Sequence, residues 1–358
     1  MPPASRRDFL RACGGAAAAI GAGFADARLL RAADENPELS AGDMITPEAD
    51  QAIELGLSFL ASRQQEDGSF GGGGYSRDVA VAALAGMAFM AGGSTPGRGP
   101  HGDKVENCIR YLTDNTQDSG YINAPGSGSH GPMYGHGFAT LYLASVYGME
   151  EDGNQQQKLK RVLDKAVKLI GGAQSSAGGW IYTPDSGGDE GSVTVTQIQA
   201  LRACRMAGVI VDKKVIDKAV DYIKKCQNAD GSIRYSLGSG DDGRPAITAA
   251  GVAVLYNAGV YDDQPFVDKA VQYCKRQIQI SVDNTGHHFY THLYWSQALF
   301  QRGGKDWVDY YEKQTQWLLR QQKKDGSWEG DGVGAVYGTA IALLILQLPY
   351  ANAPIYQR

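Results

Sequence analysis

Two kinds of helical pattern alternate along the chain. In one kind, apolar residues fall on a single stripe, as Ala219 and Tyr222 do within residues 214–225, and charged residues fall opposite. Such a helix keeps one face in water. In the other kind the residues are apolar nearly all round and rich in alanine and glycine, which predicts helices that are enclosed on every side. These apolar runs are Val79–Met90, Phe138–Tyr147, Ile247–Leu255 and Thr339–Leu348.

A short phrase recurs between the two kinds of helix. It reads SRQQEDGSFGGGG from Ser62 to Gly74 and RQQKKDGSWEGDG from Arg320 to Gly332. Weaker copies lie between these two, and all copies align on a glutamine. The six anchoring glutamines, 45 to 57 residues apart, are Gln64, Gln117, Gln174, Gln227, Gln277 and Gln322. A period of this length indicates a repeat architecture.

Six pairs of one half-wet helix and one enclosed helix predict two concentric layers. An open solenoid normally has atypical terminal repeats, whereas the first and last repeats here carry the best-formed phrase. We therefore expect an all-α fold, an (α/α)6 toroid of six helix hairpins closed into a ring.

The phrase itself has a structural role. Glycine after a helix adopts the left-handed conformation that helix ends favour. The glutamine amide can tie adjacent repeats, and the aromatic residue supplies an apolar anchor.

The repeats share the pattern aromatic-(Leu/Ile)-x3-Gln-x(2–5)-Gly-x-Trp. This pattern resembles the QW motif of the prenyltransferase and squalene-oxidase repeat superfamily. Good matches are Phe59–Phe70, Tyr222–Ile233 and Trp317–Trp328. The superfamily includes squalene-hopene cyclases and protein prenyltransferase β subunits, and the resemblance implies an (α/α)6 toroid over about residues 46–350. It implies no particular activity, because the motif belongs to the scaffold.

The stretch between the aromatic residue and the enclosed helix is polar in every repeat. All six stretches lead into enclosed helices, so they should gather around one mouth of the ring, where loops on a rigid scaffold place binding residues. The candidate ligand-binding residues in these stretches are Tyr75, Tyr134, His136, Tyr182, Tyr235, His288, Tyr290, His292 and Tyr337. They could grip an apolar, peptide or glycan ligand; alternatively, they only pack the mouth stretches against one another.

Paired carboxylates in two mouth stretches are candidate general acids. Squalene-hopene cyclases, which the chain resembles, protonate their substrate with an Asp-x-Asp-Asp-Thr-Ala element just before an inner helix. The nearest counterparts are Asp189-Glu190 and Asp241-Asp242. Neighbouring carboxylates can raise the pKa of one of the pair, but neither pair reproduces the element. Solvated loop acids, or acids that cap a helix N-terminus, are the alternative.

A zinc site like that of the protein prenyltransferases is not expected. His288 and His292 share a helix face, but His130 and His136 lie in a repeat on the opposite side of the ring, and no cysteine falls in a mouth stretch. We expect no metal and no cofactor.

A net charge of −5 gives no basic footprint, which argues against nucleic acid as a partner. The four cysteines after residue 27 show no CxxC spacing and fall in helical patterns; buried free thiols are the plainer reading, and a disulfide is the alternative.

The first 27 residues predict a signal peptide. Arg6-Arg7 followed by Phe9 and an apolar, alanine-rich run resembles a twin-arginine signal, which exports folded proteins. We expect a linker at 28–45, the toroid at 46–350, a tail at 351–358, no transmembrane segment in the mature chain, and a periplasmic or otherwise extracytoplasmic protein whose precursor meets the twin-arginine export machinery.

Two functions stay open. The first is an exported toroid that binds a ligand at its cavity mouth. The second is a single-domain terpenoid (squalene) cyclase-like lyase or isomerase with a loop carboxylate as general acid. The sequence favours the first, because it lacks the general-acid element, a second helical domain and the zinc ligands.

Overall fold

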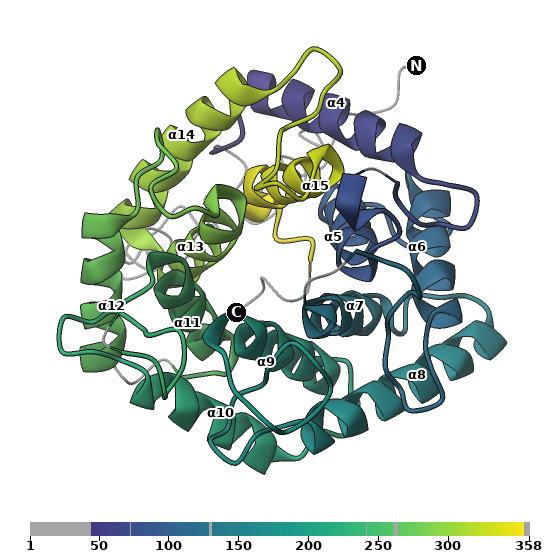
Figure 1. The fold of residues 1–358 in the computed structure, drawn as a ribbon. Coiled ribbons are helices and arrows are strands. Elements are labelled where there is room, and N and C mark those ends of the chain that lie inside the picture. Colours follow the sequence, from purple (N-terminus) through teal and green to yellow (C-terminus); the bar gives the residue numbers. More distant parts are fainter. Residues whose placement is uncertain (1–43, 72, 129–130, 241, 261–263, 354–358) are drawn as a thin grey trace, which may run out of the picture.

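Two concentric rings of helices make up the protein (Figure 1). The structure, a computed structural model, describes residues 44–71, 73–128, 131–240, 242–260 and 264–353. Within these residues the outer ring consists of α4 (Pro47–Arg63), α6 (Gly102–Asp114), α8 (Gly153–Gly172), α10 (Lys213–Lys225), α12 (Gln264–Gln277) and α14 (Gly304–Gln321). The inner ring consists of α5 (Val79–Ala91), α7 (Pro132–Val146), α9 (Gly191–Met206), α11 (Pro245–Asn257), α13 (His288–Arg302) and α15 (Ala335–Leu346). Short 3-10 turns lie at η1 (Gly73–Tyr75) and η2 (Leu348–Tyr350). The all-α toroid in two layers is confirmed.

The inner helices are enclosed, as their composition predicts. Every residue of α5 except Ala80 is buried. Each inner helix contacts the next, and α15 contacts α5, so the ring closes. Small residues allow this approach: a Cβ on Gly86 of α5 would lie only 2.5 Å from the ring of Tyr142 on α7.

The outer helices keep a wet face. On α10 the predicted stripe is buried, with both Ala219 and Tyr222 fully covered. Each outer helix packs against the inner helix of the preceding repeat, as α6 does on α5 and α12 on α11, and α4 packs in the same way on α15 of the last repeat. The repeats are thereby staggered, and no repeat is terminal.

The phrase glutamines bind neighbouring repeats together. The side-chain amide of Gln64 donates to the carbonyl of Lys104 in α6 at 3.0 Å, and Gln322 donates to the carbonyl of Ala52 in α4 at 2.8 Å. The second bond joins the last repeat to the first. Gln174 and Gln227 make the equivalent bonds to Val215 and Phe266.

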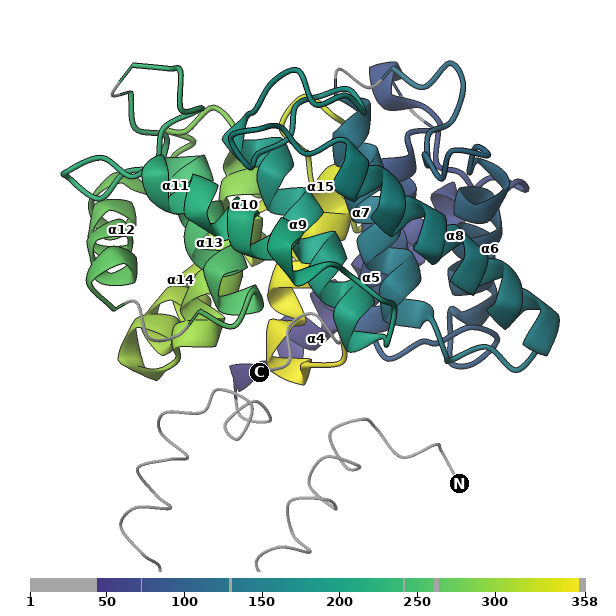
Figure 2. The same cartoon turned by 90° about the horizontal axis from the view of Figure 1, so that it is seen from below.

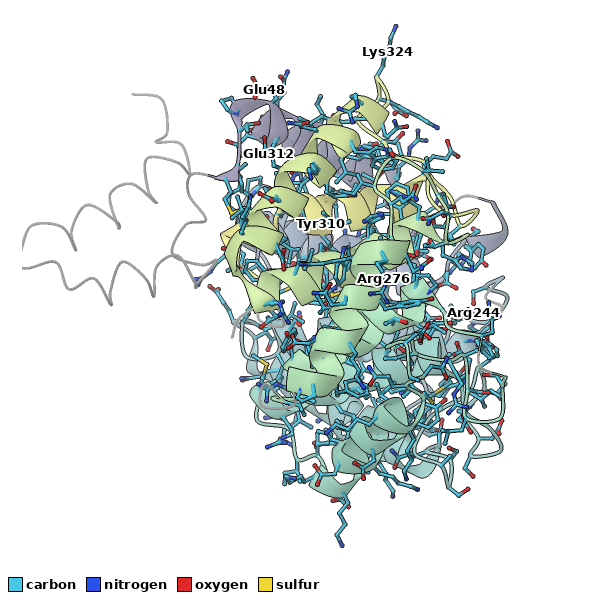
Figure 3. The ribbon with its side chains drawn as sticks, turned by 90° about the vertical axis from the view of Figure 1, so that its left-hand side faces the viewer. Glu48, Arg244, Arg276, Tyr310, Glu312 and Lys324 are labelled. Atoms are coloured by element: carbon cyan, nitrogen blue, oxygen red, sulfur yellow. The ribbon has the colours of Figure 1, made fainter. Side chains whose placement is uncertain are left out.

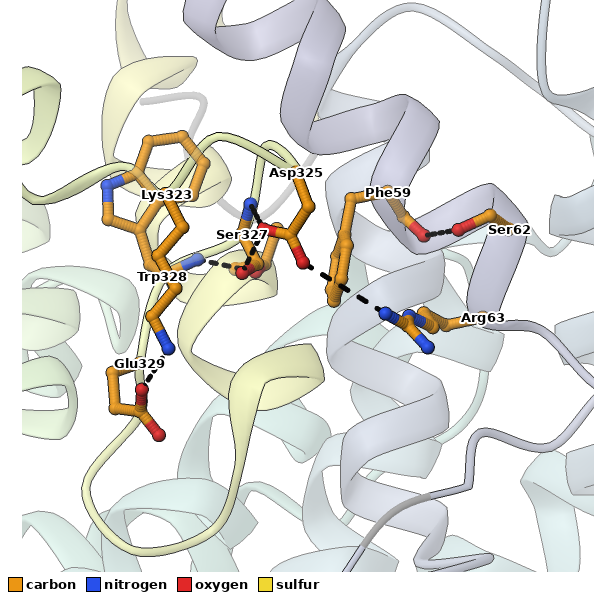
Figure 4. Close-up of polar contacts among 9 residues, drawn as sticks. Phe59, Ser62, Arg63, Lys323, Asp325, Ser327, Trp328 and Glu329 are labelled. Carbon is orange, nitrogen blue, oxygen red and sulfur yellow. Dashed lines mark hydrogen bonds and ion pairs between the residues drawn. The ribbon is translucent and has the colours of Figure 1, made fainter.

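The Asp-Gly turn of the last repeat lies against α4 of the first (Figure 4). Asp325 accepts hydrogen bonds from the backbone and hydroxyl of Ser327 and lies 4.0 Å from the guanidinium of Arg63. Gly326 has φ +86°, and a Cβ on it would meet the carbonyl oxygen of Leu55 at 2.5 Å. Glycine is therefore needed twice here, for its left-handed backbone and for the close approach of α4.

The second repeat has a different register from the one its glutamine suggests. The backbone N–H of Gln117 donates to the carbonyl of Tyr121, just as the backbone N–H of Gln65 donates to the carbonyl of Ser69 in the first repeat. Thr116 therefore occupies the anchoring position, and Ile122, not Tyr121, occupies the aromatic position. The hydroxyl of Thr116 bonds within its own helix, to Leu112.

The four cysteines of the described residues are Cys108, Cys204, Cys226 and Cys274, and all four are buried and free. This confirms the plainer reading and corrects the disulfide alternative. None of the helices in the described ranges is both long and apolar enough to cross a bilayer. The expected signal peptide at 1–27, most of the linker and residues 354–358 of the tail lie outside the described residues.

The stretches that lead into the inner helices gather on one face of the ring, the upper face in Figure 2. Arg244, the residue before α11, lies on this face in Figure 3, while Tyr310 of α14 lies on the outer wall. We call it the mouth face.

Candidate functional site

A cavity of about 590 Å³ lies at the mouth face, among the N-terminal ends of the inner helices. All six mouth tyrosines line it, one from each repeat, and each is half-buried. They are Tyr75, Tyr134, Tyr182, Tyr235, Tyr290 and Tyr337. The structure thus brings together six residues that the sequence spreads over 263 positions, from 75 to 337.

The cavity wall becomes apolar away from the tyrosines. Val81 and Leu84 of α5, Phe138 of α7 and Ile247 of α11 also line it. They come from the first two turns of helices that are otherwise enclosed, so the same apolar pattern that closes the ring also makes the inner end of the cavity apolar.

Hydroxyl groups on the wall bond to one another. The phenol of Tyr134 bonds to the hydroxyl of Ser192, which in turn bonds to the carboxylate of Glu190. The phenols of Tyr182 and Tyr235 bond to each other. Burial raises the pKa of Tyr134 well above its usual value and also raises that of Tyr235. These phenols are therefore neutral groups that donate and accept hydrogen bonds.

Three acids cap alternate inner helices. Asp78 accepts from the amide of Ala80 at the start of α5, and Glu190 accepts from the amides at the start of α9. Asp331 lies in the stretch before α15 but caps α13, accepting from Phe289 at 3.0 Å and Tyr290 at 2.9 Å. Carboxylates here satisfy amides that have no partner within the helix and complement the helix dipole. Burial nevertheless raises the pKa of Glu190 and of Asp331.

The acids singled out in the sequence do not line the cavity, as far as they are described. Glu190 is the cap of α9 and is buried behind Ser192. Asp189 accepts from the amide of Leu237 at 3.3 Å, and Asp242 pairs with Arg244 at 2.8 Å in solvent. Asp241 lies outside the described residues. The described acids thus follow the alternative reading, as a helix cap and loop acids.

The carboxyl groups that do line the cavity are those of Asp78 and Asp331. Pairing of adjacent acids could not reveal them, because Asp78 has no acidic neighbour and Asp331 is separated from Glu329 by a glycine. Their signal is position: Asp78 directly precedes an apolar run, as an N-cap does. Ser192, Arg244 and His287 also line the cavity.

His136 is a structural residue of the second repeat. It is fully buried, and its Nδ1 accepts from the amide of Ile122 at 3.1 Å. Threonines do the same in other repeats, where Thr194 accepts from Trp180, Thr248 from Ile233 and Thr339 from Trp328. Because the ring stands in for that threonine inside the core, burial lowers its pKa to about 4.

His288 and His292 lie between α13 and α14, away from the cavity. Their rings share a helix face, as expected, with centroids 4.3 Å apart, and His288 stacks on Trp317 at 4.2 Å. His292 bonds to the hydroxyl of Tyr310 at 2.8 Å. Burial lowers the pKa of His288 to about 4 and that of His292 to about 3. These two histidines were expected among the ligand-binding residues of the mouth, but the structure places them against α14, because one face of α13 is turned to the outer ring.

No set of three or more His, Cys, Asp or Glu residues within the described part of the chain is arranged to hold a metal ion.

The chain matches the model of the prenyltransferase alpha-alpha toroid domain over residues 52–169 and 156–331. Comparison with curated proteins finds no match.

Several solved structures share the fold. A variant of the type II terpene cyclase MstE from Scytonema, in complex with its substrate geranylgeranyl dihydroxybenzoate, is 16% identical with a TM-score of 0.58 over 86% of this chain and 98% of that chain. An α-1,6-mannanase from Salegentibacter is 9% identical with a TM-score of 0.57 over 85% and 99% of the two chains. A glycosidase variant in complex with glucose is 11% identical with a TM-score of 0.57 over 83% and 96%.

Identities this low establish a shared fold and no shared activity. The family match is broader evidence, because its two segments together span most of the chain. This chain belongs to the prenyltransferase alpha-alpha toroid family.

Proposed function

We propose that this toroid binds a small-molecule ligand in its central cavity. The observation that carries the proposal is the meeting of six tyrosines, one from each repeat, around a single cavity of about 590 Å³. This volume is within the range of ligand pockets, which are mostly apolar with a few polar groups. A phenol suits such a wall because it combines a large apolar ring with one hydrogen-bonding tip.

The apolar inner end of the cavity favours a small ligand with apolar surface over a glycan. The apolar residues Leu84 and Phe138 lie beyond the phenols. A ligand that buries apolar surface there gains about 25 cal/mol per Å² of area removed from water. A glycan that filled the cavity would place some of its hydroxyl groups against Leu84 and Phe138, where they find no partners.

Thermal-shift and native mass-spectrometry screens of residues 28–358 against lipids, glycans and peptides test the proposal. A binder should lose at least tenfold in affinity on Tyr182→Leu, which removes a ring from the wall. Tyr147→Leu is the matched control, since Tyr147 caps the far end of α7. Failure of every compound class, or equal affinity for the two variants, would contradict the proposal.

A terpenoid cyclase-like reaction is the second candidate. It is favoured by the half-buried carboxyl of Asp331 on the cavity wall, whose pKa burial raises. A carboxyl whose pKa is raised is a better candidate for a general acid than one with an ordinary pKa. Incubation with squalene and with prenyl diphosphates tests this candidate: products that vanish on Asp331→Asn but persist on Asp189→Asn would place the acid in the cavity.

We also propose that residues 1–27 direct export of the folded protein by the twin-arginine route. The support is the Arg6-Arg7 pair, the apolar run after it and the Ala25-Asp26-Ala27 cleavage pattern. Fusion of these residues to a reporter tests the proposal. Extracytoplasmic reporter should disappear when both arginines are replaced by lysine, and its persistence would count against this route.

A further inference from the structure

Charge is unevenly distributed over the outer ring, although the chain as a whole has a net charge of −5. α8 carries five basic residues and one acidic residue, α10 carries five and two, and α12 carries three and one. On the other half of the ring α14 is balanced, and α4 and α6 carry more acids than bases. The three helices with an excess of bases are consecutive in the ring (Figure 1). We call their outer surface the basic wall.

The basic wall is continuous, because the recurring phrase holds each outer helix against the next. Gln174, which follows α8, donates to the carbonyl of Val215 in α10 at 2.9 Å. A Cβ on Gly178 would lie only 2.4 Å from the carbonyl oxygen of Lys218, so the turn after α8 lies directly on α10. The same two kinds of contact join the turn after α10 to α12.

Most acids of the basic wall already have a basic partner. Asp164 and Asp217 each pair with the lysine four residues before them, at 2.6 and 2.7 Å, and Asp268 pairs with Arg302 at 2.8 Å. Among the described residues of the three helices, Asp221 alone of the acids has no ion pair. Five exposed bases have neither an ion pair nor a side-chain hydrogen bond within the same ranges: Arg161, Lys168, Lys214, Lys225 and Lys269.

These free bases extend along the helices. Arg161 and Lys168 are seven residues apart, which places them on one side of α8 and roughly 10 Å from each other. Lys214 and Lys225 are eleven residues apart, on one side of α10 and roughly 16 Å from each other. An exposed ion pair contributes little by itself. A partner of the basic wall must therefore be an extended anion that meets several of these bases at once.

The shape and the side chains of the basic wall select among extended anions. It covers three of the six outer helices that the structure describes, about half of a convex ring, so a flat bilayer cannot reach all three together. None of the exposed large hydrophobic side chains in the described ranges lies on these helices, so an anchor for a membrane or a protein partner is missing. Tyr222 and Tyr273 are buried and Phe266 packs on the core, which leaves no ring for nucleic-acid bases to stack on.

We propose that the basic wall binds an acidic polysaccharide, whose flexible chain follows the curve of the ring and places carboxylate or sulfate groups against the free lysines and arginine. Such a polymer carries charge along its whole length and needs no apolar pocket. The basic wall is separate from the central cavity, so this proposal does not depend on the proposed function.

Fluorescence anisotropy of labelled polygalacturonate and labelled dextran sulfate with residues 28–358 tests the proposal. At least one of the two polymers should bind saturably, and its Kd should rise steeply between about 50 and 200 mM salt, because binding releases counterions from the polymer. Uncharged dextran should not bind. Replacing three free bases together, by Arg161→Gln, Lys168→Gln and Lys214→Gln, should weaken binding about tenfold and reduce its dependence on salt.

The combination of Lys313→Gln, Arg320→Gln and Lys324→Gln is the matched control. It removes one arginine and two lysines, as the first combination does, but from α14 and the turn after it, and all three side chains are exposed. Lys324 projects from the outer surface in Figure 3. The control should bind the polymer nearly as well as wild type, and so should Tyr182→Leu, which alters only the cavity wall.

Failure of both polymers to bind at about 50 mM salt, or an equal loss of affinity in the two triple variants, would overturn the proposal. Tighter binding of polyglutamate or of phosphatidylglycerol vesicles than of either polymer would also overturn it, because the basic wall would then belong to an acidic protein or to a membrane.

Discussion

Gln199 and Gln297 bond to each other across the centre of the ring. The side-chain amide nitrogen of Gln199 donates to the amide oxygen of Gln297 at 2.9 Å, and the two side chains are only 2% and 4% exposed. Their helices, α9 and α13, are separated by α11 in the ring (Figure 1). Tyr290 of α13 also donates to the backbone carbonyl of Ser192 in α9, at 3.3 Å. Two hydrogen bonds therefore brace these helices across the inside of the ring.

Replacing one of the two glutamines should cost more than replacing both. Gln199→Met leaves the oxygen of Gln297 buried without a donor, and we expect a loss of about 1–3 kcal/mol in the free energy of unfolding. The double variant with Gln297→Met replaces both by apolar groups of similar length and should be close to wild type. Urea unfolding of the four proteins measures the coupling, and additive losses would contradict the brace.

Gly326→Ala should be more harmful than Gly332→Ala. Both glycines have positive φ, +86° and +75°, which costs an L-residue about 1–2 kcal/mol. At Gly332 the new Cβ meets open space, whereas at Gly326 it meets the carbonyl of Leu55 at 2.5 Å. We expect a further loss of about 1–3 kcal/mol at Gly326 from overpacking. Equal melting temperatures for the two variants would show that the last repeat does not need this close contact.

Threonine should partly replace His136. His136→Ala leaves the buried amide of Ile122 without an acceptor, which should lower the free energy of unfolding by about 1–3 kcal/mol. His136→Thr should recover part of this loss, because Thr194, Thr248 and Thr339 accept the equivalent bond in other repeats. Ligand affinity should not change in either folded variant. A His136→Thr protein no more stable than His136→Ala would contradict this role.

Acid should weaken the fold through its buried histidines. Their pKa values, about 4 for His136 and His288 and about 3 for His292, lie below the ordinary 6.5. Below pH 6.5 the unfolded chain therefore binds more protons than the folded chain. The free energy of unfolding then decreases as the pH is lowered, by up to about 1.4 kcal/mol per pH unit for each histidine. The pKa values of Glu190 and Asp331 are raised in the folded chain. Between their unfolded and folded pKa values the folded chain binds more protons, so these two acids make the protein more stable as the pH is lowered.

Comparison of His288→Phe with wild type isolates one histidine, since phenylalanine can still stack on Trp317. The two proteins should show parallel stability above pH 7, and wild type should lose more between pH 6.5 and about 4. Chemical unfolding at a series of pH values measures this. Parallel curves over the whole range would show that His288 is not held neutral by the fold.

The buried cysteines should resist thiol reagents. Burial raises the pKa of Cys108 and Cys204 to about 12, and the thiolate is the reactive form. Residues 28–358 should take up no reagent while folded and four equivalents in denaturant, and reductant should leave the melting temperature unchanged. Fast labelling of the native protein would contradict the burial of these side chains.

The sequence carries most of the scaffold because its signals are local. The turn around Gly326 is written within a few residues, and a helix that is apolar all round states its own burial. The six tyrosines could be found because each lies in the stretch that leads into an enclosed helix or in the first turn of that helix, and the ring brings these segments together.

What could not be predicted depends on contacts between repeats. Asp331 caps a helix that begins more than forty residues earlier, and nothing near Phe289 or Tyr290 shows this. His136 was ambiguous because a histidine in a polar stretch suits binding as well as packing. Its threonine counterparts, 11 to 15 residues after the residue at the aromatic position of the phrase, are the available signal. Gln117 is adjacent to the anchoring position of the second repeat. Only the backbone hydrogen bonds show that Thr116, and not Gln117, occupies this position.

Because Gln322 bonds to Ala52 and α15 packs against α5, the last repeat is joined to the first, and the number of repeats in the ring is fixed. An open stack of repeats can gain or lose one copy at an end and leave the others undisturbed. Here a seventh repeat would change the angle between every pair of neighbouring inner helices. It would also move the six mouth tyrosines apart. Duplication of a single unit would therefore disrupt the central cavity as well as the ring.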